Sequence, residues 1–435
     1  MPQTASSPTV TTAHDYRTRR RILLGHLGPN AGPLAIHSGQ PQSRNYPGNP
    51  YPFRASSAFL YLAGWNHPDV AVVLGHDSCV LYFDAPGVED AVWEGPGPDL
   101  EALKSRYGFD EIRPRAELPH GLVDQSHHDV VAAMVEMRLY HDVAAVAQLR
   151  SAVDISSRAH LRAMRATRPG RHERDIRAEL LASITADDAV PSFQPIVSTR
   201  GEVLHNPHSE NALHSRDLLL VDFGAENAEG WAGDLTRTYP VSGKFSPRQK
   251  EIYEVVLAAE VAAIEACHPG VRYLDVHMTA ARKITEGLVA LGLLKGSVEL
   301  LVQRGAHALF FPHGVGHLLG LDVHDMEEYG DLAGYPTGRE RNPQFGLNFL
   351  RLDRDLRIEM AVTIEPGFYW IPQLLENPER TRPFEDCLDH KTIAAYREVR
   401  GIRIEDDVLV TAEGPVVLSA SLPKTVAQLE ETIGK

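Results

Sequence analysis

Residues 313–325, HGVGHLLGLDVHD, contain three histidines and two aspartates among glycines and aliphatic residues. Such side chains can bind a metal ion or transfer protons, so we interpret this segment as part of a functional site. His313 and His317 are four residues apart, as two ligands on one helix face would be. The two glycines between them would each cost about 1 kcal/mol in a helix interior. We therefore predict an extended segment.

In an extended segment, side chains alternate between two sides with a period of two residues. His313, His317 and Asp325 are then expected on one side, while Gly314 and Gly316 allow close approach of backbone or ligand. The alternative interpretation is a surface loop with solvated histidines.

Two acidic residues are predicted to lie opposite each other in a β-hairpin. The apolar strand Leu218–Phe223 contains Asp222, and a second strand that begins at Trp231 contains Asp234. In a hairpin centred near Ala228 these two carboxylates face each other. Like charges opposite each other on paired strands are destabilising unless a cation lies between them. The hairpin therefore predicts a metal site.

Two further acids accompany apolar strands. Glu365 directly follows the predicted strand Ala361–Ile364, and a strand over residues 401–410 carries Arg403, Glu405 and Asp407 on one face. Each acid alone could be a solvated strand end. Together with His317, the four acids indicate a common site.

The ligand types indicate which metals and which reaction to expect. Asp222, Asp234, Glu365 and Glu405 bring four negative charges, which two divalent cations would match, with His317 as a single nitrogen ligand. This oxygen-rich set suits Mn²⁺ or another first-row divalent ion and excludes a cysteine-rich structural zinc site. Paired metals about 3.5 to 4 Å apart activate water and polarise the attacked carbonyl. The predicted reaction is hydrolysis.

Composition sets the class of protein that must position these residues. A chain of 435 residues with 43% hydrophobic content predicts two domains. Its net charge of −15 argues against a nucleic-acid or anionic-membrane partner. The three cysteines form no CxxC pair, no apolar run approaches 18 residues, and the N-terminus lacks a signal-like apolar region. We expect a cytoplasmic location.

The order of predicted elements indicates an α/β (α+β) fold. Short strands at 35–37, 71–75 and 79–83, the last two in a hairpin, belong to a smaller N-terminal domain. Helices are predicted within 126–168 and at 173–184 and 247–267, with a strand at 194–198. The octapeptides PGRHERDI and PGVRYLDV begin at residues 169 and 269. They suggest two related α/β halves, with chance similarity as the alternative.

Five segments together resemble the ordered motifs of the pita-bread proline-specific metallopeptidases, prolidase (Xaa-Pro dipeptidase) and aminopeptidase P (Xaa-Pro aminopeptidase). The segments are VLHNPHSEN, VDFGAENAEGWAGDLTRTYPVSGKF, FFPHGVGHLLGLDVHD, VTIEPGFY and GIRIEDDVLVT. The likeness extends from about Leu139 to the C-terminus. YPFRASSAFLYLAGW also resembles the N-terminal domain of aminopeptidase P. The turn between Asp222 and Asp234 is one residue longer than is usual in the family.

The resemblance implies an aminopeptidase P-like domain over residues 1–135 and a pita-bread catalytic domain with pseudo-two-fold halves over residues 136–435. It implies hydrolysis of the Xaa-Pro bond of short peptides that carry proline in second position. It further implies two divalent metal ions, usually Mn²⁺ with Zn²⁺ or Co²⁺ as alternatives. A homodimer or higher homo-oligomer is common in the family.

The resemblance also assigns the metal ligands residue by residue. Asp222 is expected to bind one metal and His317 the other, whereas Asp234, Glu365 and Glu405 are expected to bind or bridge both. Glu365 is in addition the expected proton acceptor.

Four further residues take catalytic roles by resemblance. His205 and His324 resemble histidines that contact substrate, and His313 resembles the outer histidine beside them. Arg403 is expected to hold the Glu405 carboxylate by a charge-assisted hydrogen bond, with a purely structural ion pair as the alternative.

The segment YPTGRERNPQFGLNFLRLDRDL before Glu365 looks more like prolidase than aminopeptidase P. Within it, Arg351 occupies the position that in prolidases resembles a clamp on the free carboxylate of the substrate proline. We therefore favour an Xaa-Pro dipeptidase, with an Xaa-Pro aminopeptidase acting on longer peptides as the alternative. For Arg351 alone, a solvated surface arginine is the other interpretation.

Three other classes were weighed against this hypothesis. A methionine aminopeptidase usually lacks an N-terminal domain of this size. A metal-free binding module on the same fold loses ligands, whereas all five ligand positions here hold competent side chains. A creatinase-like enzyme, which is metal-free, would not need these acids.

Overall fold

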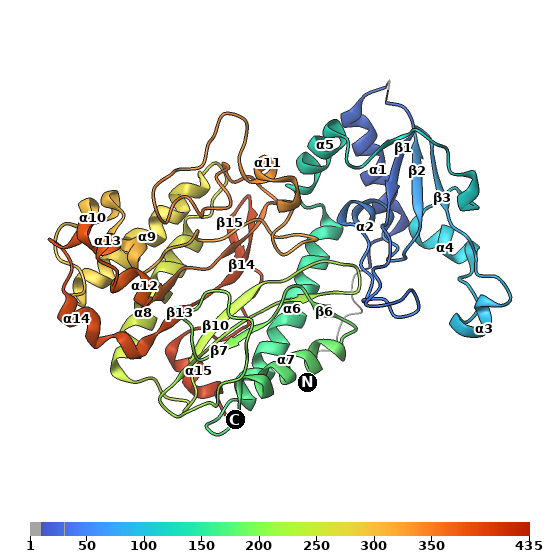
Figure 1. The fold of residues 1–435 in the computed structure, drawn as a ribbon. Coiled ribbons are helices and arrows are strands. Elements are labelled where there is room, and N and C mark those ends of the chain that lie inside the picture. The colour runs from blue at the N-terminus through green and yellow to red at the C-terminus, as the bar shows by residue number, and fades with distance from the viewer. Residues whose placement is uncertain (1–9, 30) are drawn as a thin grey trace. The chain divides into compact units, whose positions relative to one another are not determined.

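The computed structural model describes residues 10–29 and 31–435, which divide into two compact units, Met1–Gln148 and Leu149–Lys435 (Figure 1). Both units mix helices and strands, as the predicted α/β class requires. The boundary expected between residues 135 and 136 falls inside helix α5 (His128–Arg138). No helix in the described ranges combines the length and apolar character that a membrane crossing needs.

Unit 1 contains a five-stranded sheet with the order β4-β3-β2-β1-β5. Its strands are β1 (Leu34–His37), β2 (Ala71–Gly75), β3 (Ser78–Tyr82), β4 (Glu111–Arg113) and β5 (Val123–Asp124). The central three pair antiparallel, and β4 and β5 join the two edges in parallel. β2 and β3 form the predicted hairpin. The other elements of the unit are α1 (Ala13–Leu27), α2 (Ser57–Ala63), α3 (Asp90–Glu94), α4 (Leu100–Tyr107), η1 (Arg115–Glu117) and α5.

Two of the four arginines in the short basic run of α1 are buried. Arg19 is 2% exposed, pairs with Asp142 at 2.8 Å and donates to the Tyr61 carbonyl. Arg20 is also buried and donates to the carbonyls of Tyr16 and Gly108. These two arginines therefore serve the packing of unit 1 and do not form a basic binding surface.

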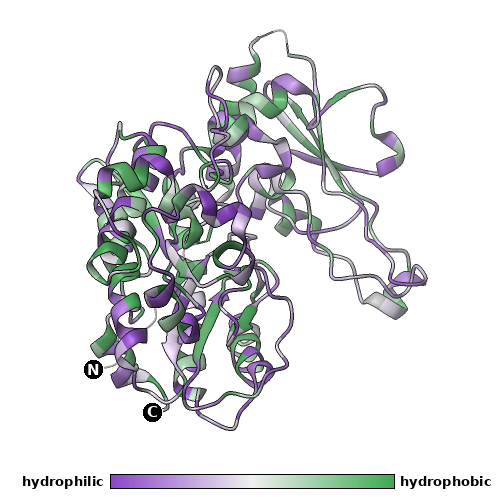
Figure 2. Ribbon diagram, turned by 60° about the vertical axis from the view of Figure 1, so that its left-hand side comes forward, coloured by the Kyte–Doolittle hydropathy of each residue, from purple (hydrophilic) through white to green (hydrophobic). Residues whose placement is uncertain are grey.

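Unit 2 has two three-stranded sheets, β10-β8-β7 and β11-β14-β15, and two strand pairs, β12-β13 and β6-β9. The strands are β6 (Val190–Pro191), β7 (Ile196–Ser198), β8 (Leu218–Phe223), β9 (Ala225–Glu226), β10 (Leu235–Pro240), β11 (Ala361–Ile364), β12 (Gly367–Tyr369), β13 (Gly401–Arg403), β14 (Asp406–Thr411) and β15 (Gly414–Val417). Every residue of β8, β10 and β11 is buried. The apolar strands are therefore core, as the hydropathy colouring in Figure 2 illustrates.

The longer helices of unit 2 are α6 (Val143–Ala166), which contains the unit boundary, α7 (Glu173–Thr185), α8 (Pro247–Glu265), α9 (Tyr273–Ala290), α10 (Val298–Arg304) and α15 (Val426–Thr432). Shorter ones are η2 (Ala306–Leu309), η3 (Glu327–Tyr329), α11 (Asp331–Gly334), α12 (Pro372–Leu375), α13 (Pro378–Thr381), η4 (Arg382–Phe384), α14 (His390–Ala395) and η5 (Arg397–Val399). α8 and α9 pack against each other.

The two Pro-Gly motifs that repeat in the sequence adopt the same local geometry. Gly170 and Gly270 have φ angles of 89° and 88°, a region that favours glycine. Their N–H groups donate to the carbonyls of Leu213 and Leu356 respectively. α7 and α9 then begin at the same point of each motif. The repeat therefore marks equivalent positions in two halves of the catalytic fold.

Three predicted boundaries differ from the structure. The helical stretch expected over residues 126–168 is two helices, and Asp142 accepts the Ala145 N–H as an N-cap of the second. The strand expected over residues 401–410 is interrupted between β13 and β14, at Glu405. The strand expected to begin at Trp231 begins at Leu235. The last two differences concern the segments that carry Glu405 and Asp234.

Candidate metal centre and active site

Asp222 lies on β8, but Asp234 is not its direct partner. In the β8–β10 ladder Asp222 stands opposite Thr236, and Asp234 comes just before β10. The prediction that the two aspartates face each other was therefore wrong by two residues. Since side chains alternate with a period of two, the shift leaves both carboxylates on the same face.

Backbone contact across the turn explains this register. A Cβ on Gly224 would lie 1.7 Å from the carbonyl oxygen of Gly233. The turn is also longer than a simple hairpin because β9 pairs with β6, and Glu226 bridges to Ala232. Two glycines in contact thus set the separation of the strands that carry the aspartates.

Asp234 is held by its main chain. Its N–H donates to Asp407 Oδ2 at 3.0 Å, while its own Oδ1 is buried and without a hydrogen-bond partner. Asp407 therefore fixes the backbone of Asp234 and leaves the carboxylate of Asp234 available to a ligand.

The glycine- and histidine-rich segment is extended, as predicted, and runs beside β11. Thr363 N–H donates to the His317 carbonyl, and Glu365 N–H donates to the Val315 carbonyl at 2.7 Å. Gly316 has a φ of 155°, and a Cβ there would lie 2.1 Å from the Thr363 oxygen. Only glycine permits this approach of the two backbones.

The extended geometry ends before Asp325. Asp325 is buried, and its N–H donates back to the Leu318 carbonyl, so the chain turns between these two residues. Its Oδ1 accepts the Asp322 N–H. The prediction that Asp325 shares a side with His313 and His317 was therefore wrong, because a turn replaces the strand period there.

His317 presents one ring nitrogen to the acids. Its Nδ1 lies 2.9 Å from the Leu318 carbonyl oxygen, which can only accept, so Nδ1 carries the proton. Nε2 then has a free lone pair and lies 3.3 Å from Asp234 Oδ2 and 3.9 Å from Glu365 Oε1. This is the tautomer that a metal-binding histidine needs.

Glu365 and Glu405 adjoin strands β11 and β14 of the sheet β11-β14-β15. Glu365 follows β11, and Glu405 lies in the interruption between β13 and β14. Glu405 N–H donates to the Thr236 carbonyl, and the Thr236 hydroxyl donates to Glu405 Oε2 at 2.7 Å. The interruption thus joins the two sheets and turns Glu405 toward Asp234. Ligand atoms of Asp234, His317 and Glu405 all lie within 4.8 Å of one another.

The side chains around the buried acids do not supply enough positive charge to balance them. Burial is the largest cause that raises the pKa values of Asp234 and Glu405 well above their ordinary range, and neighbouring acids raise them further. Burial also raises the pKa of Glu365 to about 7. Asp222 Oδ1 and Asp234 Oδ1 are buried without a partner. Divalent cations would satisfy both the charges and these oxygens, so the residues present fit a metal centre.

Arg403 contacts a different acid from the one predicted. Its Nη2 donates to Asp222 Oδ2, and its Nε donates to Thr236 Oγ1 at 3.2 Å. Arg403 therefore reaches Glu405 only through the Thr236 hydroxyl, and the expected direct bond to Glu405 is not formed. β13 ends at Arg403 and β14 begins at Asp406, so the strand alternation expected to place Arg403 and Glu405 on one face is interrupted between them.

Tyr369 connects Arg403 with His313. The Tyr369 hydroxyl accepts from Arg403 Nη1 at 3.0 Å and lies 2.8 Å from His313 Nε2. His313 Nδ1 donates to the Gly314 carbonyl, so Nε2 accepts the Tyr369 proton. Burial lowers the pKa of His313 to about 3, which keeps the ring neutral.

All ten candidate residues line one cavity of about 750 Å³. They are His205, Asp222, Asp234, His313, His317, His324, Arg351, Glu365, Arg403 and Glu405. Apolar and aromatic side chains, among them Phe193, Ile196 and Phe349, complete its wall. A cavity with convergent polar groups on one side and apolar groups on the other suits a short peptide.

The three remaining candidates stand around the acids. The ring of His324 lies 4.1 Å from that of His317, centroid to centroid. Partial desolvation, followed by the charge of Arg403, lowers the pKa of His205. Arg351 is ion-paired with Glu327, whose Oε2 lies 2.6 Å from Arg351 Nη1. The structure thus brings together every residue named from the sequence except Asp325.

Sequence reasoning missed three residues that hold the site together, namely Thr236, Glu327 and Tyr369, and it named Asp407 without predicting its contact with Asp234. Tyr369 and Asp407 lie inside motifs that were quoted, and Thr236 follows Asp234 by two residues. Their roles depend on hydrogen bonds to partners distant in the sequence. The one local signal is the run of polar residues 236–238 inside a buried strand, since buried polar groups need hydrogen-bond partners.

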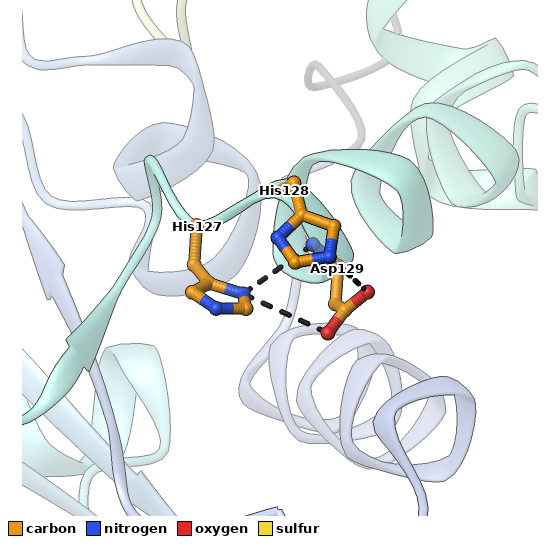
Figure 3. A group of neighbouring side chains, drawn as sticks. All are labelled: His127, His128 and Asp129. Carbon is orange, nitrogen blue, oxygen red and sulfur yellow. Dashed lines mark hydrogen bonds and ion pairs between the residues drawn. The ribbon is translucent and has the colours of Figure 1, made fainter.

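A second group of ligand-type side chains lies at the start of α5, where His127, His128 and Asp129 meet (Figure 3). Asp129 lies 3.0 Å from His128 Nε2 and 3.8 Å from His127 Nδ1. His127 Nδ1 also accepts the Asp129 N–H, as a helix N-cap. All three side chains are exposed, so we interpret them as a cap with surface ion pairs.

Comparison with known families agrees with the fold and the cavity. Residues 147–412 match the model described as metallopeptidase family M24, and residues 16–131 match the N-terminal domain of aminopeptidase P. Fold and site thus define a metallopeptidase with a pita-bread catalytic domain. More particularly, the chain belongs to metallopeptidase family M24. The resemblance and the fold class expected from the motifs are confirmed.

Relatives of the chain align along nearly all of its length. It is 31% identical to the Xaa-Pro aminopeptidase of Escherichia coli (strain K12), with 96% of each chain covered. It is 30% identical to the Xaa-Pro aminopeptidase of Haemophilus influenzae, again over 96% of each chain. These similarities support the aminopeptidase alternative and not the preference for a dipeptidase, which the segment before Glu365 had suggested.

Solved structures of aminopeptidases also resemble this chain along nearly all of its length. Proline aminopeptidase P II from Yersinia pestis superposes with a TM-score of 0.80 at 30% identity and covers 97% of this chain and 99% of its own. Aminopeptidase PepP from Pseudomonas aeruginosa has a TM-score of 0.81 at 29% identity and covers 98% of each chain. A zinc-substituted E. coli aminopeptidase P in complex with product has a TM-score of 0.80 at 28% identity, with 98% of each chain covered. The zinc in that structure and the match to a metallopeptidase family support the use of a divalent metal by this chain.

Proposed function

We propose that the protein is an Xaa-Pro aminopeptidase, which removes the N-terminal residue from peptides with proline in second position. The observation that carries the proposal is similarity to Xaa-Pro aminopeptidases along both units, including the N-terminal domain that matches aminopeptidase P. A dipeptidase was favoured on the basis of one segment near Arg351, and the full-length similarity outweighs that segment.

We propose that the centre holds two divalent ions, with Mn²⁺ as the first candidate. Asp222, Asp234, His317, Glu365 and Glu405 would bind them. When bound, such ions supply an activated water and polarise the scissile carbonyl. Support comes from the buried acid cluster, the two unpaired carboxylate oxygens and the free Nε2 of His317.

The remaining residues have positioning and proton-transfer roles in this proposal. Glu365 accepts a proton at its carboxylate during hydrolysis. His205 and His324 contact the substrate from the cavity wall, and His313 holds the hydroxyl of Tyr369 by accepting its proton. Arg403 fixes Asp222 and the Tyr369 hydroxyl at the same time.

Location and assembly belong to the same proposal. Cys79, Cys267 and Cys387 are free and buried, which supports a reducing compartment such as the cytoplasm. Val92 and Trp93, on α3, are 75% and 88% exposed, which supports a homo-oligomer that covers them. Sedimentation equilibrium measures the assembly state directly.

Activity on matched peptides tests the function. With Mn²⁺ supplied, we expect cleavage of Ala-Pro-Ala, with release of alanine, at a kcat/KM at least about 10²-fold above that for Ala-Ala-Ala or Met-Ala-Ala. Chelation should abolish the activity, and returning the metal should restore it. Equal cleavage of the three peptides would contradict proline specificity.

A further inference from the structure

Besides Arg403, two arginines line the cavity, Arg341 and Arg351, and each is already paired with an acid of the chain. Arg351 donates from Nη1 to Glu327 Oε2 at 2.6 Å. Arg341 is paired with Asp331 at 2.5 Å and donates to the Leu350 carbonyl. The wall that lies beyond the acids and histidines is therefore close to neutral, although two cationic side chains form it.

Arg351 is the one whose charge reaches the catalytic residues. Its positive charge is among the causes that lower the pKa values of His205, His313 and His324, after burial in each case. Arg341 is not among these causes. Of these two arginines, Arg351 is therefore the one that interacts with the histidines of the site.

Glu327 shares one carboxylate oxygen between two partners. Its Oε2 binds Arg351 and lies 3.3 Å from His324 Nδ1, whereas its Oε1 is buried without a partner. Burial alone would raise the pKa of Glu327, but the hydrogen bond from His324 and the charges of His324 and Arg351 lower it to about 2. Glu327 is therefore a fixed negative charge at neutral pH.

Substrates of different length would present different groups to this wall. A dipeptide ends in a carboxylate on its proline, and that carboxylate would compete with Glu327 for the Arg351 guanidinium and be repelled by Glu327. A longer peptide presents a neutral amide at the same place. Because charge-assisted hydrogen bonds are roughly twice as strong as neutral ones, an unpaired Arg351 would favour the dipeptide.

We propose that Glu327 selects against dipeptides: by neutralising Arg351 it makes the wall suited to Xaa-Pro peptides that continue beyond proline. This inference rests on the proposed Xaa-Pro aminopeptidase function and names the residue that sets substrate length. Glu327 is a positioning residue, since it acts through Arg351 and not on the reacting atoms.

Glu327→Gln tests the inference through a ratio of substrates. We expect the ratio of kcat/KM for Ala-Pro to that for Ala-Pro-Ala to rise about tenfold or more, as for a hydrogen bond to a charged group. The ratio cancels any common loss that comes from disturbing His324. Glu328→Gln, which removes the same charge one residue later, should leave the ratio within about twofold.

The double variant Glu327→Gln/Arg351→Ala identifies the route of the effect. If Glu327 acts through Arg351, the gain for the dipeptide disappears in the double variant. An unchanged ratio in Glu327→Gln, an equal gain in Glu328→Gln, or a gain that survives without Arg351 would each overturn the inference.

A binding measurement needs no turnover. In titration calorimetry, the wild-type enzyme should bind L-prolinamide at least as tightly as L-proline, and Glu327→Gln should favour L-proline by about tenfold. Tighter binding of L-proline by the wild type would contradict the inference even if the variant failed to fold. Equal cleavage of Ala-Ala-Ala and Ala-Pro-Ala by the wild type would refute the proposed function. That result is distinct from an unchanged substrate ratio in Glu327→Gln, which would refute only the inference about Glu327.

Discussion

Arg403 and Asp222 form a buried ion pair in which the guanidinium also holds the Tyr369 hydroxyl and Thr236 Oγ1. The side chains are 5% and 12% exposed, so water contributes little to their solvation. One arginine therefore fixes an acid from the first sheet and a tyrosine from β12 at once.

We predict that Arg403→Ala lowers the free energy of unfolding by about 3 to 5 kcal/mol, because it leaves a buried carboxylate without its partner. Arg403→Lys should lose less stability but still lose activity, since lysine cannot make the forked contacts. Chemical denaturation and kcat measured on both variants check this. Wild-type turnover in the alanine variant would contradict the proposed role.

Asp234→Asn should abolish hydrolysis and leave the fold intact. The substitution removes one charge from a cluster that needs two divalent ions, so at least one metal should be lost or weakened. Metal content and turnover are measured together, with Asp77→Asn in an exposed turn as the control. A fully active variant with two bound metals would eliminate Asp234 as a ligand.

His324→Ala should lower kcat by about 10² or more while metal content stays unchanged. We expect this because His324 packs beside His317 but its Nδ1 is directed to Glu327, away from the acids. If the variant instead loses metal and keeps its rate per bound metal, His324 is a ligand.

The free energy of unfolding should decrease at acidic pH, partly because His277 and His307 are buried. Burial lowers the pKa of His277 to about 3 and that of His307 to about 4. Below the ordinary value of about 6.5 the unfolded chain takes up protons that the folded chain refuses, so the free energy of unfolding decreases as pH falls. Above that value this contribution is fully present.

Each such histidine contributes a slope of about 1.4 kcal/mol per pH unit between pH 6 and 4. His277→Leu should therefore reduce the loss of stability between pH 7 and pH 5, whatever it does to the absolute value. Phe311→Leu disturbs the ring stacked on His277 but titrates nothing, so its cost should be the same at both pH values. Equal pH dependence in His277→Leu and wild type would refute the assignment.

Much of the site was predictable because residue type and local sequence pattern indicate it. β8 and β11 are short apolar runs that end near Asp222 and Glu365, and the glycines around His317 exclude a helix. Local propensity and residue type were sufficient in these cases.

The sequence did not reveal contacts between residues far apart in the chain. The interruption at Glu405 exists because its backbone pairs with Thr236, 169 residues earlier. The register of β8 and β10 depends on the pairing of β9 with β6. The preference for a dipeptidase rested on Arg351 as an unpaired cation, and the sequence did not reveal its ion pair with Glu327.

The contact between Gly224 and Gly233 bears on how this enzyme tolerates change. The main-chain atoms of these two glycines lie in contact beside Asp222 and Asp234, so this part of the spacing does not depend on side-chain packing in the surrounding helices. Any side chain at position 224, however small, would have to push the two segments apart. In a saturation-mutagenesis library selected for activity, position 224 should accept fewer residues than many deeply buried core positions. A laboratory that remodels the cavity for new substrates can vary its apolar wall, such as Phe193, Ile196 and Phe349, but should leave this glycine pair untouched.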